Sequence, residues 1–284
     1  MHVLITGVKG MLGADIYQSI SSKYKVTGVG HTELDITNKE EVINTLNNLK
    51  PELVINCAAY TKVDDCEKNT AKAFSVNGEG VKNLATVCGE LGTVLLQVST
   101  DYVFDGFKKS PYSENDLTNP KSIYGKSKLA GEEYIENMLE KYFIVRTSWL
   151  FGNNGNNFVS TILRLAKERN ELSIVYDQVG SPTYTRDLAG AITKLINSTN
   201  YGTYHITNSH HCSWYELAKE ILYLADIKEV KVKPITTTQF NRPAPRPAFS
   251  VLENKQWQAT GNTLLRPYSE ALADYLQKVE GIKQ

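Results

Sequence analysis

A tyrosine and a lysine four residues apart are the clearest chemical signal in this sequence. Tyr124 and Lys128 lie in YGKSK, shortly after Asn119-Pro120, where the pattern predicts a helix over 122–139. Residues four apart share one helix face. An ammonium within reach of a phenol favours the phenolate and lowers the phenol pKa from about 10. A tyrosine tuned in this way can transfer a proton to or from a carbonyl oxygen, although an exposed structural pair has the same spacing.

A second group of polar side chains follows an apolar stretch. Ser99 and Thr100 end TVLLQVST (93–100), which predicts a buried strand, and Asp101 follows directly. Open α/β sheets bind their ligands beyond the carboxyl ends of their strands. The Thr100 hydroxyl is therefore a candidate to hydrogen-bond the reacting carbonyl oxygen beside Tyr124. A helix cap or turn cap is the alternative role for this threonine.

Three glycines precede the first predicted helix. The segment GVKGMLG (7–13) follows the β-branched run HVLIT (2–6). Glycines at this spacing allow a tight turn, close backbone approach to a pyrophosphate, and close packing of helix on strand. The helix N-terminus supplies N–H donors and the positive end of its dipole to the phosphates. The segment predicts a dinucleotide-binding turn, and a glycine-rich turn without a ligand is the alternative.

The second predicted strand ends without a carboxylate. It reads Val29-Gly30-His31-Thr32, whereas an NAD-binding fold places an acid there to hold the ribose 2′-hydroxyl. Asp35 follows only later and fits the adenine pocket together with Ile36. Without an acid, a 2′-phosphate is not repelled, and Lys9 and His31 are candidates to meet it. The pattern favours NADPH over NADH, with NADH as the alternative.

These residues belong to a regular alternation of short apolar runs and amphipathic stretches. Such repeats imply βαβ crossovers and a parallel sheet covered on both faces. We therefore expect a doubly wound, Rossmann-like α/β fold. Strands are predicted over 2–7, 24–30, 52–59, 93–100 and 141–148, and helices over 11–22, 39–50, 70–92 and 122–139.

The second half of the chain is less regular and richer in loops. It begins with GNNGNN (152–157) and carries three prolines and two arginines in NRPAPRPAF (241–249). We expect an NAD(P)-binding domain over 1–150 and a smaller substrate lobe over 151–284, with 173–197 as a segment that can return to the main sheet. The predicted elements are helices near 158–169, 186–197 and 214–227, and strands over 173–178 and 202–207.

Composition excludes several classes of protein. The 284 residues include 31 Lys and Arg, 31 Asp and Glu, and 41% hydrophobic residues. This balance argues against disorder, a dedicated nucleic-acid binder and a polybasic membrane anchor. No apolar run approaches the roughly 18 residues of a spanning helix. The N-terminal MHVLITG lacks a charged leader, and the four cysteines have no metal spacing, so we expect a cytoplasmic protein with reduced thiols.

Together the glycine turn, the Ser/Thr after a sheet strand and Tyr-x-x-x-Lys resemble the extended short-chain dehydrogenase/reductase superfamily. Longer segments are similar to the dTDP-4-dehydrorhamnose reductase family within it, over about residues 1–260. They are NCAAYT (56–61), VSTDYVFDG (98–106), RTSWLFG (146–152), DQVGSPT (177–183), RPA (242–244) and SVL (250–252).

That resemblance implies reduction of the 4-keto group of dTDP-4-dehydro-β-L-rhamnose by NAD(P)H, the last step toward dTDP-L-rhamnose for cell-envelope polysaccharide. By position, Tyr124 donates the proton, Lys128 tunes it and binds the nicotinamide ribose, and Thr100 orients the carbonyl. The implied cofactor-binding residues are Gly7, Gly10, Met11, Leu12, Gly13, Asp35, Ile36, Ala58, Ala59, Tyr60, Ser99, Tyr124 and Lys128. The implied substrate-binding residues are Thr100, Asp101, Tyr102, Trp149 and Arg242.

Several alternatives stay open at this point. Either Arg242 or Arg246 can meet the dTDP diphosphate, since arginine offers a planar donor fork. Trp149 suits the apolar face of a deoxysugar, and a buried core tryptophan is its alternative role. Family members with Mg²⁺ at a homodimer interface use acidic residues, and the sequence places no such cluster. The rival functions are another dTDP- or UDP-sugar reductase or epimerase, and a non-catalytic NADP-binding regulatory subunit.

Overall fold

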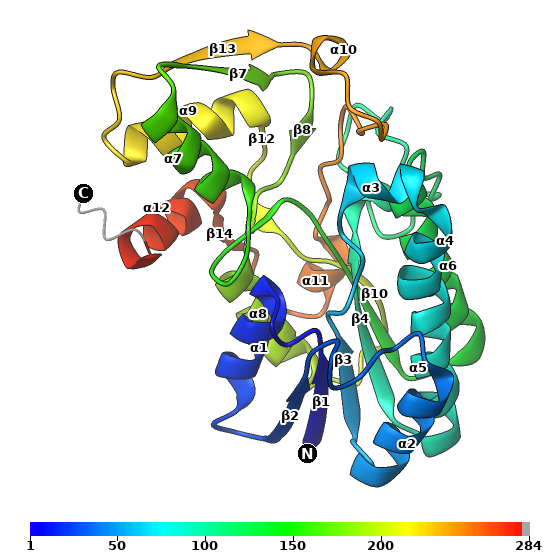
Figure 1. Ribbon diagram of the computed structural model, residues 1–284. Helices are drawn as coiled ribbons and strands as arrows, with labels where there is room; N and C mark the ends of the chain where they lie inside the picture. The colour runs from blue at the N-terminus through cyan, green and yellow to red at the C-terminus, as the bar shows by residue number, and fades with distance from the viewer. Residues whose placement is uncertain (280–284) are drawn as a thin grey trace.

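A parallel sheet of six strands is the centre of the fold in the computed structural model, which describes residues 1–279. The strand order is β2-β1-β3-β4-β5-β10, and every neighbouring pair is parallel. Figure 1 shows the labelled strands β2, β1, β3 and β4 side by side, with their carboxyl ends toward the smaller lobe. The strands are β1 (His2–Thr6), β2 (Lys25–Val29), β3 (Leu53–Asn56), β4 (Val94–Thr100), β5 (Tyr142–Thr147) and β10 (Gly202–His205).

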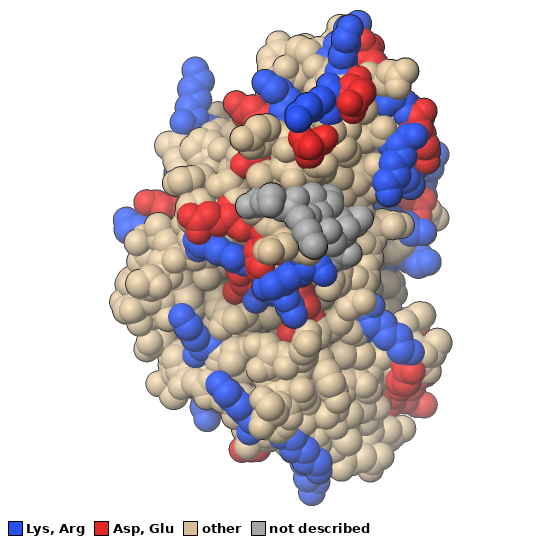
Figure 2. Space-filling model, turned by 90° about the vertical axis from the view of Figure 1, so that its left-hand side faces the viewer, with Lys and Arg blue, Asp and Glu red and all other residues tan. Residues whose placement is uncertain are grey.

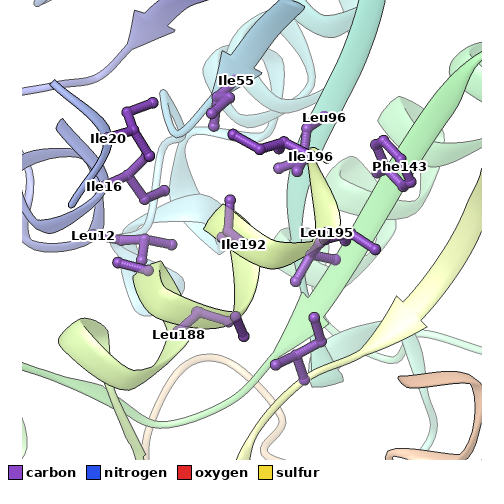
Figure 3. Packing of buried hydrophobic residues seen from close by; sticks show 14 of the residues in the cluster. Leu12, Ile16, Ile20, Ile55, Leu96, Phe143, Leu188, Ile192, Leu195 and Ile196 are labelled. Carbon is purple, nitrogen blue, oxygen red and sulfur yellow. The ribbon is translucent and has the colours of Figure 1, made fainter. Parts of the chain in front are cut away.

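Helices cover both faces of this sheet, as a parallel sheet requires. On one face, α1 (Met11–Ile20) and α8 (Thr185–Leu195) pack against each other and against the sheet, as Figure 3 shows. On the other face lie α2 (Lys39–Leu49), α5 (Gly80–Leu91) and α6 (Ile123–Met138). α5 continues α4 (Thr70–Phe74) through the π-helical turn η1 (Ser75–Glu79). Both apolar faces of the sheet are thereby removed from water.

The smaller lobe combines three helices with short strand pairs around its own core. The parallel pairs are β6 (Leu150–Phe151) with β9 (Thr183–Tyr184), β7 (Glu171–Val175) with β13 (Lys231–Ile235), and β11 (Asn208–Ser209) with β14 (Leu265–Pro267). The antiparallel pair is β8 (Val179–Gly180) with β12 (Cys212–Ser213). The helices are α7 (Phe158–Glu168), α9 (Trp214–Leu224) and α12 (Tyr268–Val279).

Four short helices lie in the connections between these elements. They are α3 (Val63–Lys68), η2 (Asp101–Val103), α10 (Thr237–Phe240) and α11 (Lys255–Ala259). The proline-rich segment 241–249 contains no helix and is interrupted by bends, so it is less regular than the extended segment predicted. It runs from the smaller lobe to the loop after β4, where Phe249 N donates to Gly106 O, and Ser250 N then donates to Val179 O on β8.

The doubly wound fold predicted from the sequence is confirmed, with differences in the second half. The strand predicted over 173–178 begins earlier, at Glu171, because β7 takes its register from β13. α8 returns to the main sheet, and β10 adds a sixth strand beside β5. We keep residue 150 as the proposed boundary where the chain first leaves the sheet.

Charges of both signs are spread over the surface. Figure 2 shows Lys and Arg beside Asp and Glu over much of the face that carries the end of α12. Within residues 1–279, the structure contains no helix that is both long and apolar enough to cross a membrane.

We expect Ile192→Ala to destabilise the protein by about 2–5 kcal/mol, because Ile192 is fully buried between α8, α1 and the sheet. Lys194→Ala, on the exposed side of the same helix, should change the free energy of unfolding by less than about 0.5 kcal/mol. Guanidinium denaturation followed by circular dichroism measures both. Equal effects of the two variants would contradict the packing of α8 on α1.

Candidate active site

The carboxyl ends of the parallel strands open into one cavity of about 540 Å³. The chain leaves β1 for β2 on one side and then crosses to β3 on the other, so β1 and β3 flank a topological switch point. Ligands bind open α/β sheets at this position. The loops after β1, β3, β4 and β5 line the cavity from the sheet side, and residues before α7 and at the start of α9 line it from the smaller lobe.

The glycine turn has the shape that a pyrophosphate requires. Gly7 has φ +68°, and a Cβ there would lie 2.7 Å from Ala58 N. A Cβ at Gly13 would lie 2.4 Å from Gly7 O, so neither position accepts a side chain. Gly10 caps α1 without a side-chain hydrogen bond, which leaves the first N–H groups of the helix available to an anion. These residues fit a dinucleotide.

α6 approaches the cavity closely because two of its residues are glycines. A Cβ at Gly125 would lie 2.2 Å from Tyr102 O, and one at Gly131 would lie 2.4 Å from Asn77 O. The side chain of Ser122 begins the helix by accepting from Gly125 N at 3.1 Å. The Tyr124 ring, one residue into α6, then packs edge to face on Tyr102, with ring centroids 5.5 Å apart.

Tyr124 and Thr100 are neighbours, as the sequence predicted. Burial raises the pKa of Tyr124 above its ordinary value, and a hydrogen bond with the Thr100 hydroxyl opposes this. The expected lowering of the Tyr124 pKa by Lys128 is therefore wrong. Desolvation of the phenolate is the larger effect, and the Lys128 ammonium donates to Val98 O at 2.7 Å. Tyr124 is consequently a protonated phenol at neutral pH.

Lys128 is almost fully buried, at 4% exposure. Burial lowers its pKa to about 8, while the negative charge of Glu132, one turn further along α6, raises it. The ammonium lies beside Cys57, whose own pKa burial raises to about 12. Lys128 thus lies between α6 and the ends of β3 and β4, and its pKa is only slightly above neutral pH.

A buried ionic network lies behind Lys128. Arg146 on β5 donates from its Nη2 atom to Glu132 Oε2 at 2.6 Å, and Ser99 on β4 donates to the same carboxylate. His205 on β10 faces Arg146 through Nε2 at 3.5 Å, while its Nδ1 lies 3.0 Å from Tyr112 O. Nδ1 carries a hydrogen because its partner is a carbonyl, and Nε2 is an acceptor because the Arg146 guanidinium can only donate, so His205 is neutral.

Asp101 is a buried carboxyl beside Thr100. Its Oδ1 accepts from the Thr100 hydroxyl at 3.0 Å, and its Oδ2 has no hydrogen-bond partner. Burial raises the pKa of Asp101 to about 6, although hydrogen bonds from Ser250 and Thr100 oppose this. The cavity therefore carries a carboxyl group that titrates near neutral pH.

Two stacked tryptophans form the wall on the side of the smaller lobe. Trp149 and Trp214 are parallel, with ring centroids 3.4 Å apart and 6° between their planes. Trp149 has φ +48°, and a Cβ at Gly180 would lie 2.5 Å from its indole. The glycine in DQVGSPT therefore makes room for this ring. An extended aromatic surface of this kind suits a base or the apolar face of a sugar.

Comparison with known proteins decides which family has this arrangement. The family model described as the RmlD substrate binding domain matches residues 1–280. The chain belongs to the RmlD family. This confirms the resemblance to dTDP-4-dehydrorhamnose reductases that the sequence motifs indicate.

Solved structures and curated relatives agree with the family over nearly the whole chain. A dTDP-4-dehydrorhamnose reductase from Clostridium acetobutylicum has TM-score 0.96 and 46% identity, covering 99% of this chain and 100% of that one. A dTDP-4-dehydrorhamnose reductase from Bacillus anthracis in complex with NADP has TM-score 0.96 and 42% identity, covering 98% and 99%. The spore coat polysaccharide biosynthesis protein SpsK of Bacillus subtilis is 41% identical, covering 97% of each chain.

In this RmlD-family chain, most of the residues predicted for the site line the one cavity. They are Gly7, Gly10, Met11, Leu12, Gly13, Ala59, Ser99, Thr100, Asp101, Tyr102, Tyr124, Lys128 and Trp149.

The other predicted residues lie outside the cavity lining. Asp35 accepts from Thr37 N at 2.9 Å, and Ile36 is buried against α5. Ala58 donates from its backbone N to Asn56 Oδ1 at 3.1 Å, and the Tyr60 hydroxyl donates to Asp65. Their assignment to the cofactor stays a prediction.

Both arginines of the proline-rich segment are held by one aspartate. Arg242 Nη1 lies 3.4 Å from Asp64 Oδ2, and Arg246 Nη2 lies 2.9 Å from Asp64 Oδ1. Arg246 also donates to the Tyr102 hydroxyl at 2.9 Å and lines a second, smaller cavity beside the first. Arg242 is half exposed. The choice of Arg242 for the diphosphate stays a prediction.

Several residues that line the cavity were missed in the sequence. Ser148 and Thr147 follow β5 at the same edge as Thr100, so the strand-end rule could have found them. Trp214 begins α9 and meets Trp149 only in the folded chain, so no sequence pattern links the two. The other missed residues are Cys57, Thr61, Val63, Val98, Leu150 and Asn156.

Acidic, cysteine and histidine side chains do not gather into a metal-binding group anywhere in residues 1–279. The metal requirement is therefore kept as an expectation from the resemblance alone.

We expect His205→Gln to lose less stability in acid than the wild type. Burial lowers the pKa of His205 to about 3, below the unfolded value of about 6.5, and the positive charge of Arg146 adds to this. The stability that His205 contributes is complete above pH 6.5 and is lost as pH falls toward 3. Between pH 7 and pH 4.5 the wild type should lose about 2–3 kcal/mol more than the variant.

Urea denaturation at several pH values measures this difference. A difference in unfolding free energy between the two proteins that stays constant with pH would show that His205 is not buried as a neutral group.

Proposed function

We propose that this chain reduces the 4-keto group of dTDP-4-dehydro-β-L-rhamnose with NAD(P)H to give dTDP-L-rhamnose. The observation that carries the proposal is the single cavity in which the glycine turn, Thr100, Tyr124 and Lys128 meet. Membership of the RmlD family and 42–46% identity to reductases of this sugar support the substrate. We propose the cytoplasm as its location, because sugar nucleotides are assembled there.

The cofactor side of the proposal rests on the turn over residues 7–13. This turn would hold the pyrophosphate at the N-terminus of α1, with Ala59 of the cavity lining and its neighbours Ala58 and Tyr60 assigned to the nicotinamide half from the resemblance. When bound, NAD(P)H supplies a hydride to the carbonyl carbon. The complex of the Bacillus anthracis relative with NADP supports the phosphorylated form.

Tyr124 would supply the proton. Its phenol is protonated at neutral pH because burial raises its pKa, and this is the form that a general acid needs. The Thr100 hydroxyl is hydrogen-bonded to the Tyr124 phenol and would orient the substrate carbonyl toward it. The buried Lys128 lines the same cavity, where its ammonium would favour the negative charge that develops on the carbonyl oxygen during the reaction.

Sugar and base would lie between the sheet edge and the smaller lobe. Asp101 and Tyr102 follow Thr100 on one side of the cavity, and Trp149 stacked on Trp214 forms the other side. A dTDP-4-keto-6-deoxy-D-glucose reductase of Streptomyces niveus, 35% identical over 95% of this chain, supports a second candidate substrate: another 4-keto dTDP-deoxysugar that differs in ring stereochemistry.

The test is oxidation of NADPH by the purified protein given dTDP-4-dehydro-β-L-rhamnose made in situ. Parallel arms contain NADH, EDTA, or a 4-keto dTDP-sugar of different stereochemistry. Stoichiometric oxidation with dTDP-L-rhamnose as the product supports the proposal. Turnover of the other sugar alone would move the assignment to the second candidate. Binding of NADPH without turnover of any sugar would favour a regulatory subunit.

We expect Tyr124→Phe to lower kcat by about 10²–10⁴-fold, because the variant keeps the ring and loses the proton donor. NADPH binding should be retained, as measured by quenching of protein fluorescence. Tyr134→Phe is the matched control, since Tyr134 lies on the same helix and its hydroxyl donates to Glu79 at the surface.

Thr100→Val provides a graded comparison. It should lower kcat less than Tyr124→Phe, because it removes an orienting hydrogen bond and leaves the acid in place. Unchanged turnover in Tyr124→Phe, or a larger loss in Thr100→Val, would contradict the roles assigned here.

A further inference from the structure

One carboxylate on α3 holds both arginines of the proline-rich segment, and it holds them unequally. Arg246 Nη2 lies 2.9 Å from Asp64 Oδ1 and the side chain is 19% exposed, whereas Arg242 Nη1 lies 3.4 Å from Oδ2 and is 52% exposed. Between the two arginines, Ala244 N donates to Asp64 Oδ1 at 3.2 Å. Figure 1 shows the chain after α10 passing α3. Asp64 therefore fixes Arg246 and the backbone beside it, and it leaves Arg242 loosely held.

The fixed arginine contacts the wall of the main cavity through Tyr102. Arg246 donates from Nη1 to the Tyr102 hydroxyl at 2.9 Å while its Nη2 faces Asp64. A guanidinium group is a rigid planar fork, so the carboxylate that holds Nη2 also sets the direction of Nη1. Tyr102 lines both the main cavity and the smaller one, and Arg246 lines the smaller one. Asp64 thus orients a residue of the main cavity from behind its wall.

This contact also decides how the Tyr102 hydroxyl can bind a ligand. Arginine can only donate, so the hydroxyl accepts from Arg246 and keeps its own hydrogen. Burial raises the pKa of Tyr102, although the positive charge of Arg246 opposes this, so the phenol is protonated at neutral pH. No acceptor within residues 1–279 takes that hydrogen. The hydrogen is therefore left for an acceptor oxygen on a ligand.

Direct binding of the substrate diphosphate is the alternative role for Arg246. A phosphate oxygen that took Nη2 would have to displace the Asp64 carboxylate and would free the Tyr102 hydroxyl to turn. The looser and more exposed Arg242 has neither constraint. One carboxylate neutralises only one of the two guanidinium groups, so the cluster keeps one positive charge for an anion. The geometry gives that task to Arg242 rather than to Arg246.

We propose that Asp64 and Arg246 are positioning residues, which together hold the Tyr102 hydroxyl as a hydrogen-bond donor to an oxygen of the sugar nucleotide. Asp64 fixes the guanidinium, the guanidinium fixes the hydroxyl, and the hydroxyl contacts the substrate. The inference rests on the proposed function, which supplies the sugar nucleotide.

The experiment measures initial rates of NADPH oxidation over a range of concentrations of dTDP-4-dehydro-β-L-rhamnose made in situ. Tyr102→Phe removes the donor, and Arg246→Met removes the group that orients it while keeping an unbranched apolar stem. We expect each variant to raise KM by about five- to tenfold, the effect of one hydrogen bond, with kcat within about threefold of the wild type. The Kd for NADPH, from nicotinamide fluorescence, should stay within about twofold.

The double variant Tyr102→Phe/Arg246→Met separates positioning from direct binding. If Arg246 acts through the Tyr102 hydroxyl, its loss has no further effect once that hydroxyl is gone. The double variant should therefore have the KM of Tyr102→Phe, within about twofold. Asp64→Asn keeps an acceptor for Ala244 N and removes the charge that holds Arg246. It should raise KM by about threefold in the wild-type background and leave KM unchanged in Arg246→Met.

Glu168→Gln is the matched control. It breaks an exposed pair of the same type on α7, in which Arg164 Nη1 donates to Glu168 Oε1 at 3.2 Å. Its KM and kcat should stay within about twofold of the wild type. A rise in KM equal to that of Asp64→Asn would show that the loss of any such pair is sufficient, and it would overturn the role of Asp64.

The remaining results distinguish this inference from the reductase proposal. A KM for the double variant that rises by the product of the two single effects would show that Arg246 binds the substrate independently of Tyr102. A Kd for NADPH that rises as much as KM would show a general loss of structure. Either result would overturn the inference and leave the reductase proposal standing. Failure of the wild-type protein to reduce any 4-keto dTDP-sugar would overturn both.

Discussion

The buried ion pair between Glu132 and Arg146 fixes α6 on the sheet, and the site depends on that placement. Glu132 is 1% exposed and Arg146 is 5% exposed. Removal of either partner would leave an uncompensated charge in the core, at a cost of about 3–5 kcal/mol. Because Arg146 comes from β5 and Ser99 from β4, the carboxylate ties one turn of the helix to two strands. Rotation of α6 is thereby excluded.

The same placement determines the protonation states in the cavity. Lys128 lies one turn before Glu132 and keeps a pKa near 8 in a site where burial alone would lower it further. Tyr124 lies one turn earlier again, at the cavity, where desolvation holds the phenol protonated. A helix turned by one residue would present Gly125 in place of Tyr124. The chemistry thus depends on a carboxylate that lies outside the cavity lining.

Much of the sheet and the sheet side of the cavity could be predicted from the sequence, because each signal there is local. A strand, a glycine turn and a strand-end hydroxyl are contiguous segments, and parallel strands bring their ends to one edge. The missed features depend on contacts that side chains make only in the folded chain. Glu33 lies three residues beyond Gly30 and reaches it only by folding back, while Trp214 meets Trp149 across the smaller lobe. Burial decides that the pKa of Tyr124 is raised, and the spacing of Tyr124 and Lys128 in the sequence does not reveal burial.

Buried contacts also link the glycine turn on one side of the cavity to the loop at Gly152 on the other side. Asp15 on α1 is buried, and its Oδ2 accepts from the Thr185 hydroxyl, at the start of α8, at 2.5 Å. A Cβ at Gly152 would lie 1.8 Å from that hydroxyl, and Asn157 donates to Gly152 O at 2.9 Å. The helix that begins at the glycine turn is therefore linked, through Thr185, to the loop that carries Asn156 into the cavity. Because this contact is buried and polar, a shift of the loop would expose or orphan a carboxylate. The loop at Gly152, which follows the strand after Trp149, is thus anchored on the helix of the glycine turn through α8.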